Sequence, residues 1–158
     1  MNGSVLDVTK RFLKFAVVGS SGVLVNLGIY WLMSRGLDLR HNLWAENAAY
    51  AFSVEISIIT NFLLNDLWTF RDRRSASPFT IRFYRFHMVS FVGFGINWGA
   101  FALINWMLHK SGLVLLGNFE MLGRTRNIDD LIAACIGIGA AMSWNFAANL
   151  LWTWKENR

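Results

Sequence analysis

Four long stretches that carry almost no charge constrain what this chain can fold into. They cover residues 15–34, 45–67, 86–108 and 131–152. A transmembrane helix needs about 20 predominantly apolar residues, and each stretch has that length. Only 16% of the 158 residues are charged, whereas charged residues make up about a quarter of a soluble domain. The sequence therefore predicts an all-α membrane protein, a single transmembrane domain over 1–158 with four transmembrane helices.

The lysines and arginines are distributed unevenly between the connections. Ten lie in the N-terminal segment, the central loop and the C-terminal tail: Lys10, Arg11, Lys14, Arg71, Arg73, Arg74, Arg82, Arg85, Lys155 and Arg158. Five lie in the other two loops: Arg35, Arg40, Lys110, Arg124 and Arg126. Because cytoplasmic loops carry the excess of positive charge, we expect both termini and the central loop in the cytoplasm.

The chain contains an internal repeat. Residues 11–33 align without gaps to 82–104, with eight of 23 positions identical. The sequence Asn-Phe-x-x-Asn-x-Leu-Trp-Thr at 61–69 recurs at 145–153. We expect repeat 1 over about 11–70, repeat 2 over about 82–154, and a cytoplasmic linker over 71–81. Both copies begin at a basic cytoplasmic segment, so they are parallel two-helix repeats, an arrangement that occurs in transporters.

The repeated motifs carry a family resemblance. The basic-aromatic start at 11–15, the Val-Gly-x-x-Gly-x-x-x-Asn run at 18–26 and the two Asn-Phe-x-x-Asn boxes resemble the GtrA-like family. The resemblance implies a small four-helix protein of a bacterial-type inner (plasma) membrane that moves polyprenyl-phosphate-linked sugars to the outer leaflet. It also implies an alternative role, in which the protein recruits a partner polyprenyl-phosphate glycosyltransferase. Neither the sugar nor the choice between these roles follows from the resemblance.

Four cations at the starts of the first and third helices are candidates to bind the lipid phosphate. Arg11 and Lys14 form an i, i+3 pair that recurs as Arg82 and Arg85, so each pair shares a helix face. A lipid phosphate lies at this depth, and a guanidinium matches its oxygens. The alternative is a topology signal with general attraction to anionic headgroups. Asp66 is expected to pair with Arg71 or Arg85.

Six asparagines at repeated positions within the predicted helices are candidate site residues. Asn61, Asn65, Asn145 and Asn149 are near the cytoplasmic ends, where we expect their amides to contact the sugar headgroup. Asn26 and Asn97 lie near mid-membrane beside glycines, lining a cavity or bonding between helices. The alternative for all six is interhelical hydrogen bonding, because an unsatisfied amide in a bilayer costs several kcal/mol.

Glu55 is the one acidic residue midway along a predicted span. It lies roughly 15 Å from either end of its helix at the rise of an α-helix. An ionisable group at that depth indicates a functional site. Two roles are open, proton coupling and binding of sugar hydroxyls in a cavity. The alternative is a hydrogen bond to a neighbouring helix.

Other features narrow the functional classes. A single cysteine, Cys135, excludes an internal disulfide framework, and the three histidines lack metal-ligand spacing. We therefore expect no metal and no cofactor. No nucleophile–base pairing stands out and the phosphate-binding sequence Gly-x-x-x-x-Gly-Lys-Ser/Thr is absent, so we expect no enzyme activity. The long apolar stretches favour a membrane over nucleic acid as the partner of this basic chain. A small multidrug-type proton antiporter is a further alternative, although the first helix lacks the carboxylate it needs.

Four helices alone hardly enclose a sugar passage, so we expect a homo-oligomer, with a dimer favoured. Trp68, Phe70, Trp152 and Trp154 are expected to form an interfacial aromatic belt.

Overall fold

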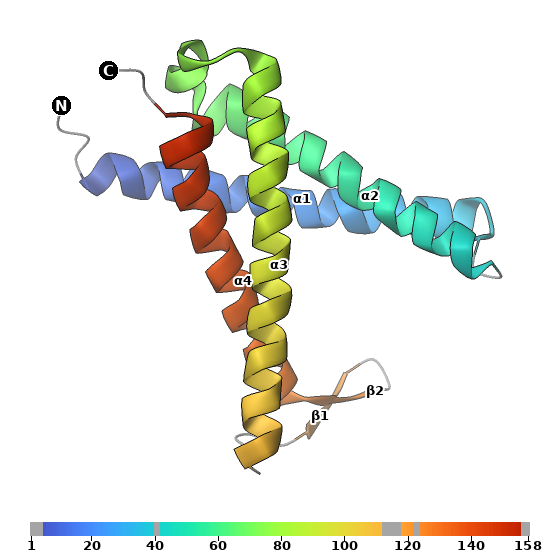
Figure 1. Ribbon diagram of the computed structural model, residues 1–158. Helices are drawn as coiled ribbons and strands as arrows, with labels where there is room; N and C mark the ends of the chain where they lie inside the picture. Colours follow the sequence, from blue (N-terminus) through green and yellow to red (C-terminus); the bar gives the residue numbers. More distant parts are fainter. Residues whose placement is uncertain (1–4, 40–41, 112–117, 122–123, 156–158) are drawn as a thin grey trace. The chain divides into compact units, whose positions relative to one another are not determined.

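The computed structural model describes residues 5–39, 42–111, 118–121 and 124–155. Its long helices are α1 (Val5–Gly36), α2 (Leu43–Leu64), α3 (Phe79–Ser111) and α4 (Ile128–Ala148) (Figure 1). Each coincides with one of the predicted spans and is long and apolar enough to cross a membrane. The prediction of an all-α membrane fold with four spans is confirmed.

Shorter elements extend and connect these helices. α2 continues into a π-helical turn, η2 (Asn65–Thr69), which is followed by the 3-10 helix η3 (Arg71–Ala76). α4 likewise ends in a π-helical turn, η4 (Asn149–Thr153). Between α3 and α4, β1 (Asn118–Met121) pairs antiparallel with β2 (Arg124–Asn127). This hairpin was not predicted, since eight residues of strand give no hydrophobic alternation that stands out beside the helical spans.

The chain divides into two compact units. The first contains Met1–Phe86 with Thr153–Arg158, and the second contains His87–Trp152. In the first unit α1 and α2 run side by side in opposite directions (Figure 1). Asn42 caps the start of α2, because its Oδ1 accepts from the backbone N–H groups of Trp44 and Ala45. A cap at this position ends the short connection and sets the first turn of α2.

Small and polar residues make the contact between α1 and α2. Ser57 Oγ donates to the Gly22 carbonyl oxygen at 2.7 Å, and Ser53 Oγ donates to Asn26 Oδ1 at 2.8 Å. The Asn61 side chain lies directly on Gly22, where an added Cβ would come 2.5 Å from Asn61 Oδ1. Close backbone approach at glycine and hydrogen bonds between helices are the forces that join helices in a bilayer, where hydrophobic association is weak.

The second unit repeats this packing with α3 and α4. An added Cβ at Gly93 would come 2.5 Å from Asn145 Oδ1, which matches the contact between Gly22 and Asn61. Gly137 packs against Asn97 at the positions that Ser53 and Asn26 hold in the other repeat. In addition, Trp144 Nε1 donates to the Val89 carbonyl oxygen at 3.3 Å. The sequence repeat therefore corresponds to the same helix-pair contact made twice. How the two pairs are arranged in the membrane stays a prediction.

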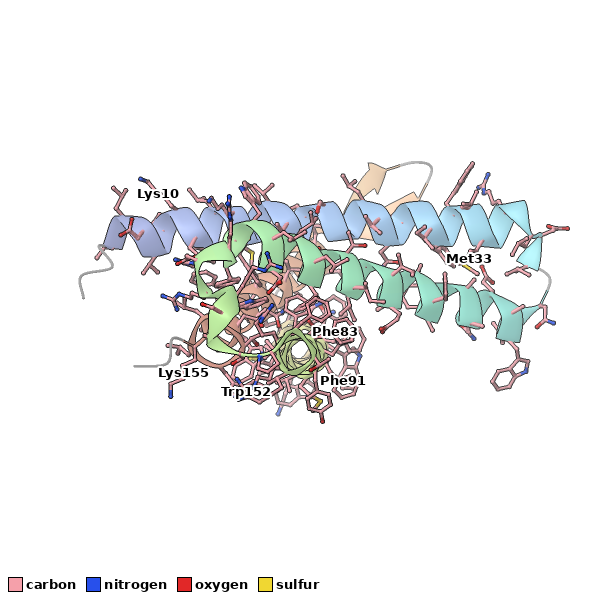
Figure 2. The ribbon with its side chains drawn as sticks, turned by 90° about the horizontal axis from the view of Figure 1, so that it is seen from above. Lys10, Met33, Phe83, Phe91, Trp152 and Lys155 are labelled. Atoms are coloured by element: carbon pink, nitrogen blue, oxygen red, sulfur yellow. The ribbon has the colours of Figure 1, made fainter. Side chains whose placement is uncertain are left out.

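The outer faces of the helices are apolar and exposed. Even in the most buried span, α4 with η4, only 22% of the most hydrophobic window is buried within the protein. Figure 2 shows side chains projecting outward along α1, Lys10 among them, and along α2 beside it, whereas Met33 lies on the side of α1 that faces α2. Exposed apolar side chains suit contact with lipid. The spans are also helices, which satisfy their backbone hydrogen bonds internally, as a bilayer requires.

Candidate functional site

The polar and aromatic cluster at the ends of the helices in the first unit is the candidate functional site. Its centre is Phe62, which is fully buried near the end of α2. The Phe62 ring centroid lies 5.2 Å from that of Phe79, 5.1 Å from Phe83, 5.6 Å from Phe86 and 6.1 Å from Trp154. The cluster therefore joins the end of α2, the start of α3 and the residue after η4.

Two residues predicted for the interfacial belt belong to this core instead. Phe70 and Trp154 are 0% exposed and stack with their ring centroids 4.3 Å apart. They follow the two Asn-x-x-x-Thr turns at matching positions of the repeat, so the stack pairs equivalent residues. The belt prediction is wrong for Phe70 and Trp154, because aromatic core packing outweighs the interfacial preference of these side chains. Trp68 and Trp152 are 46% and 45% exposed, as an interfacial position requires.

Asp66 is the electrostatic centre of the cluster. Its Oδ1 accepts from Arg82 Nε at 2.8 Å and from Trp154 Nε1 at 2.9 Å. Its Oδ2 accepts from Arg74 Nε at 3.0 Å and from Arg82 Nη2 at 3.1 Å. One buried carboxylate thus gathers donors from η3, from α3 and from the residue that follows η4. The prediction that Asp66 pairs with Arg71 or Arg85 is wrong, because the arginines that bind Asp66 are Arg74 and Arg82.

Arg82 is held inside the protein. Its side chain is 5% exposed, and its two forked nitrogens Nε and Nη2 both bind Asp66. Its remaining nitrogen Nη1 donates to the carbonyl oxygens of Arg74 and Ser77. With all three nitrogens engaged, Arg82 fixes the linker onto the start of α3.

Arg11, the matching residue in repeat 1, is also paired with a carboxylate. Its two terminal nitrogens bind the two oxygens of Asp72 at 2.8 Å each, and Nη1 also donates to the Thr69 carbonyl oxygen at 3.1 Å. This ion pair lowers the pKa of Asp72 below its usual range. Since the folded-state pKa is lowered, the pair stabilises the fold above the ordinary pKa of an aspartate and is lost as the pH falls through the lowered value.

The second cation of each repeat is placed differently. The Lys14 ammonium lies over the Trp68 ring, 5.4 Å from its centroid. Arg85, the matching residue in repeat 2, is half-buried and makes interactions of its own. Three of the four predicted phosphate ligands can therefore be told apart by their contacts. The first arginine of each repeat is neutralised within the protein, whereas Lys14 stands beside an exposed indole.

The four asparagines of the boxes are more deeply placed than a headgroup contact suggests. Asn65 and Asn149 are 1% and 0% exposed, and each opens a π-helical turn. Asn61 and Asn145 fill the space above glycines of the neighbouring helix. Within the described residues, the Oδ1 atoms of all four lack a hydrogen-bond partner. Turns of π-helix recur at functional sites, and buried polar oxygens require partners.

The three candidates near the middle of the spans occupy two kinds of position. Asn26 and Asn97 lie between helices, whereas Glu55 lies on an exposed face. Asn26 accepts from Ser53 in the interface of α1 and α2, and Asn97 faces Gly137 between α3 and α4. Glu55 lies on the exposed side of α2 within its unit, away from the buried Ser53 and Ser57 that face α1. The structure therefore separates the two asparagines, which are packed between helices, from Glu55 on an outer face.

Sequence reasoning missed Asp72 as a partner of Arg11 and Trp154 as a donor to Asp66. The partners lie 61 and 88 residues apart in the chain, so no local spacing connects them. One signal was available in each case. The linker contains Asp72 among its arginines. Trp154 occupies the repeat position that matches Phe70, and its indole has an N–H donor that phenylalanine lacks.

Comparison with known proteins agrees with this architecture. The family model described as the transmembrane domain of GtrA/DPMS matches residues 14–154. The chain belongs to the GtrA/DPMS transmembrane-domain family. It is also 33% identical over 145 residues to a dolichol-phosphate mannosyltransferase of Pyrococcus furiosus. That match covers 91% of this chain and 34% of the relative, so the chain spans about a third of the relative's length.

The family membership confirms the resemblance drawn from the repeated motifs. The GtrA/DPMS chain is a multi-pass membrane protein related to polyprenyl-phosphate sugars. The matched range contains all four spans except the first turns of α1. It also contains Asp66, Arg82 and Trp154, so the buried charge cluster lies within the matched range.

Proposed function

We propose that this GtrA/DPMS domain carries a polyprenyl-phosphate-linked monosaccharide from the cytoplasmic to the outer leaflet of the inner membrane. The observation that carries the proposal is the family match across all four spans. Lys14 and the amide oxygens of the asparagine boxes (unpartnered among the described residues) support it, because an ammonium binds a phosphate and amide oxygens accept hydrogen bonds from sugar hydroxyls. The chain itself acts without enzyme activity, cofactor or metal.

The membrane potential is sufficient to drive this movement. A polyprenyl phosphosugar with a neutral sugar carries one negative charge on its phosphodiester. With the inside negative, outward movement is favourable by about 2.3 kcal/mol per 100 mV. The protein then needs only to lower the barrier for the polar headgroup, so neither ATP nor a proton gradient is required.

Reconstitution tests the proposal. The purified chain is placed in liposomes that contain a labelled polyprenyl phosphosugar on one leaflet, and exposure of the sugar to an impermeant probe outside is followed over time. We expect exposure faster than in protein-free liposomes, and faster still when a potassium gradient sets the lumen negative. A rate equal to that of protein-free liposomes in a folded preparation would refute translocation.

Recruitment of a glycosyltransferase is the second candidate. It is favoured by the partial match, since this chain corresponds to about a third of a relative that is named a mannosyltransferase. In this reading a separate polyprenyl-phosphate glycosyltransferase docks on the protein at the membrane. Co-purification of the two from cells, and loss of the transferase from membranes when this chain is deleted, would support it.

A homodimer would supply the enclosure that one copy lacks. Four helices with mostly exposed apolar faces leave little room for a sugar passage inside one chain. We propose a dimer in which two copies flank the headgroup path. Mass measurement in lipid nanodiscs distinguishes one copy from two.

A further inference from the structure

Two of the four cations predicted to bind the lipid phosphate are already paired with carboxylates, whereas Lys14 is not paired with any described carboxylate. Arg11 is paired with Asp72, and Arg82 is paired with Asp66. Lys14 makes no ion pair with any described residue, and its ammonium lies 5.4 Å from the centroid of the Trp68 ring. A half-buried lysine near a membrane surface is a strong attractor for a phosphate.

Trp68 is the indole beside Lys14, and its side chain is exposed. It is 46% exposed, whereas the next two residues, Thr69 and Phe70, are 3% and 0% exposed. The core is formed by Phe62, Phe70 and Trp154, so Trp68 is not needed there. Its ring offers an apolar face and an N–H donor beside a cation.

We infer that Lys14 and Trp68 together bind the phosphosugar headgroup, the ammonium binding the phosphodiester and the indole packing against the sugar ring. The inference rests on the proposed function, because it takes its ligand from there. The sequence repeat supports it, since the matching positions carry a cation, Arg85, and an equally exposed tryptophan, Trp152. The phosphate half of the site could also be met by an anionic phospholipid, and the test distinguishes these sources.

The chain contains a matched control for the pair. Near the other end of α1, the Arg35 guanidinium lies 6.0 Å from the centroid of the Trp31 ring, and Trp31 is 59% exposed. Lys10, which projects away from α2 (Figure 2), is an exposed cation one turn before Lys14. Trp31→Leu and Lys10→Gln therefore remove an indole and a positive charge without touching the proposed site.

Binding is measured on the full chain in phosphatidylcholine nanodiscs. Three probes are titrated: a polyprenyl phosphosugar, the same polyprenyl phosphate without sugar, and phosphatidylglycerol. Lys14→Gln should weaken both polyprenyl ligands about tenfold, as expected for one charge-assisted hydrogen bond. Trp68→Leu should weaken the phosphosugar about fivefold and leave polyprenyl phosphate unchanged. Lys14→Arg and Trp68→Phe should retain most of the affinity, and both controls should match the wild type.

Three results would overturn the inference. One is an equal effect of Lys14→Gln and Lys10→Gln, which would show a general surface charge. Another is phosphatidylglycerol binding as tightly as the phosphosugar, which would show an anionic-lipid site. The third is an equal loss of affinity for both polyprenyl ligands in Trp68→Leu, which would show that Trp68 supports folding or contacts the polyprenyl tail and does not contact the sugar. Melting temperatures of the variants confirm that each is folded.

The inference and the proposed function can fail separately. Translocation in liposomes that is insensitive to Lys14→Gln and Trp68→Leu would refute the site and leave transport standing. Headgroup binding that depends on both residues, without translocation, would support the site and refute the flippase proposal.

Discussion

At the scale of single residues, one carboxylate organises the candidate site. Asp66 has 2% of its side chain exposed and accepts four hydrogen bonds from Arg74, Arg82 and Trp154. In repeat 2 the matching position is Leu150. The repeat is therefore broken at this point, where one acid serves donors from both halves of the chain.

We expect Asp66→Asn to destabilise the protein by about 3–5 kcal/mol, because it leaves Arg82 buried without a counter-charge. Unfolding in mixed micelles, followed by tryptophan fluorescence, measures this change. Asp72→Asn is the matched control, because its carboxylate is 58% exposed and also binds an arginine. Its loss should cost less than about 1 kcal/mol. Similar losses in the two variants would contradict the structural role of Asp66.

Glu55 permits a second test at this scale. The passive electrical drive makes proton exchange unnecessary, so we expect Glu55→Gln to transport at near the wild-type rate and Glu55→Ala to be impaired. Glutamine keeps a donor and an acceptor in a similar shape, whereas alanine keeps neither. The measurement is the liposome assay at two pH values. A folded Glu55→Gln protein that binds lipid and does not transport would identify Glu55 as a coupling residue.

At the scale of elements, glycines set how closely the helices of each pair approach. We expect Gly22→Ala to destabilise the α1–α2 contact by about 1–3 kcal/mol, because the new methyl group overlaps the Asn61 side chain. Gly93→Ala should do the same between α3 and α4. Gly19 and Gly95 have no atom within 4 Å of an added Cβ.

Gly19→Ala and Gly95→Ala therefore serve as controls and should be neutral or slightly stabilising, since alanine favours a helix over glycine by about 1 kcal/mol. Unfolding free energies of the four variants in one micelle system make the comparison. If Gly22→Ala and Gly19→Ala behaved alike, close packing against Asn61 would not hold the pair together.

At the scale of the whole molecule, the orientation prediction rests on the ten-to-five division of basic residues. We expect a cysteine at Ser75 to react only from the cytoplasm and one at Asn118 only from outside. The native Cys135 is replaced by serine first, so that a single thiol is present. Labelling of Ser75→Cys by an impermeant reagent in intact cells would reverse the assignment.

The sequence by itself determined the four spans and the internal repeat. These features are local or periodic. An apolar run of membrane-spanning length has few stable alternatives to a helix in a bilayer, and a duplicated motif can be read directly from the chain.

Only the tertiary structure decided which arginine meets which carboxylate and which aromatic residues are buried. Arg82 rather than Arg71 or Arg85 binds Asp66, and Trp154 reaches the same carboxylate from 88 residues away. Phe70 leaves the surface because Trp154 stacks on it. Helical spacing fixes the face on which a residue lies, but the residue opposite that face depends on how distant segments pack. The same sequence signal, a basic residue beside an aromatic one, therefore gives a buried structural arginine at Arg82 and a headgroup candidate at Lys14.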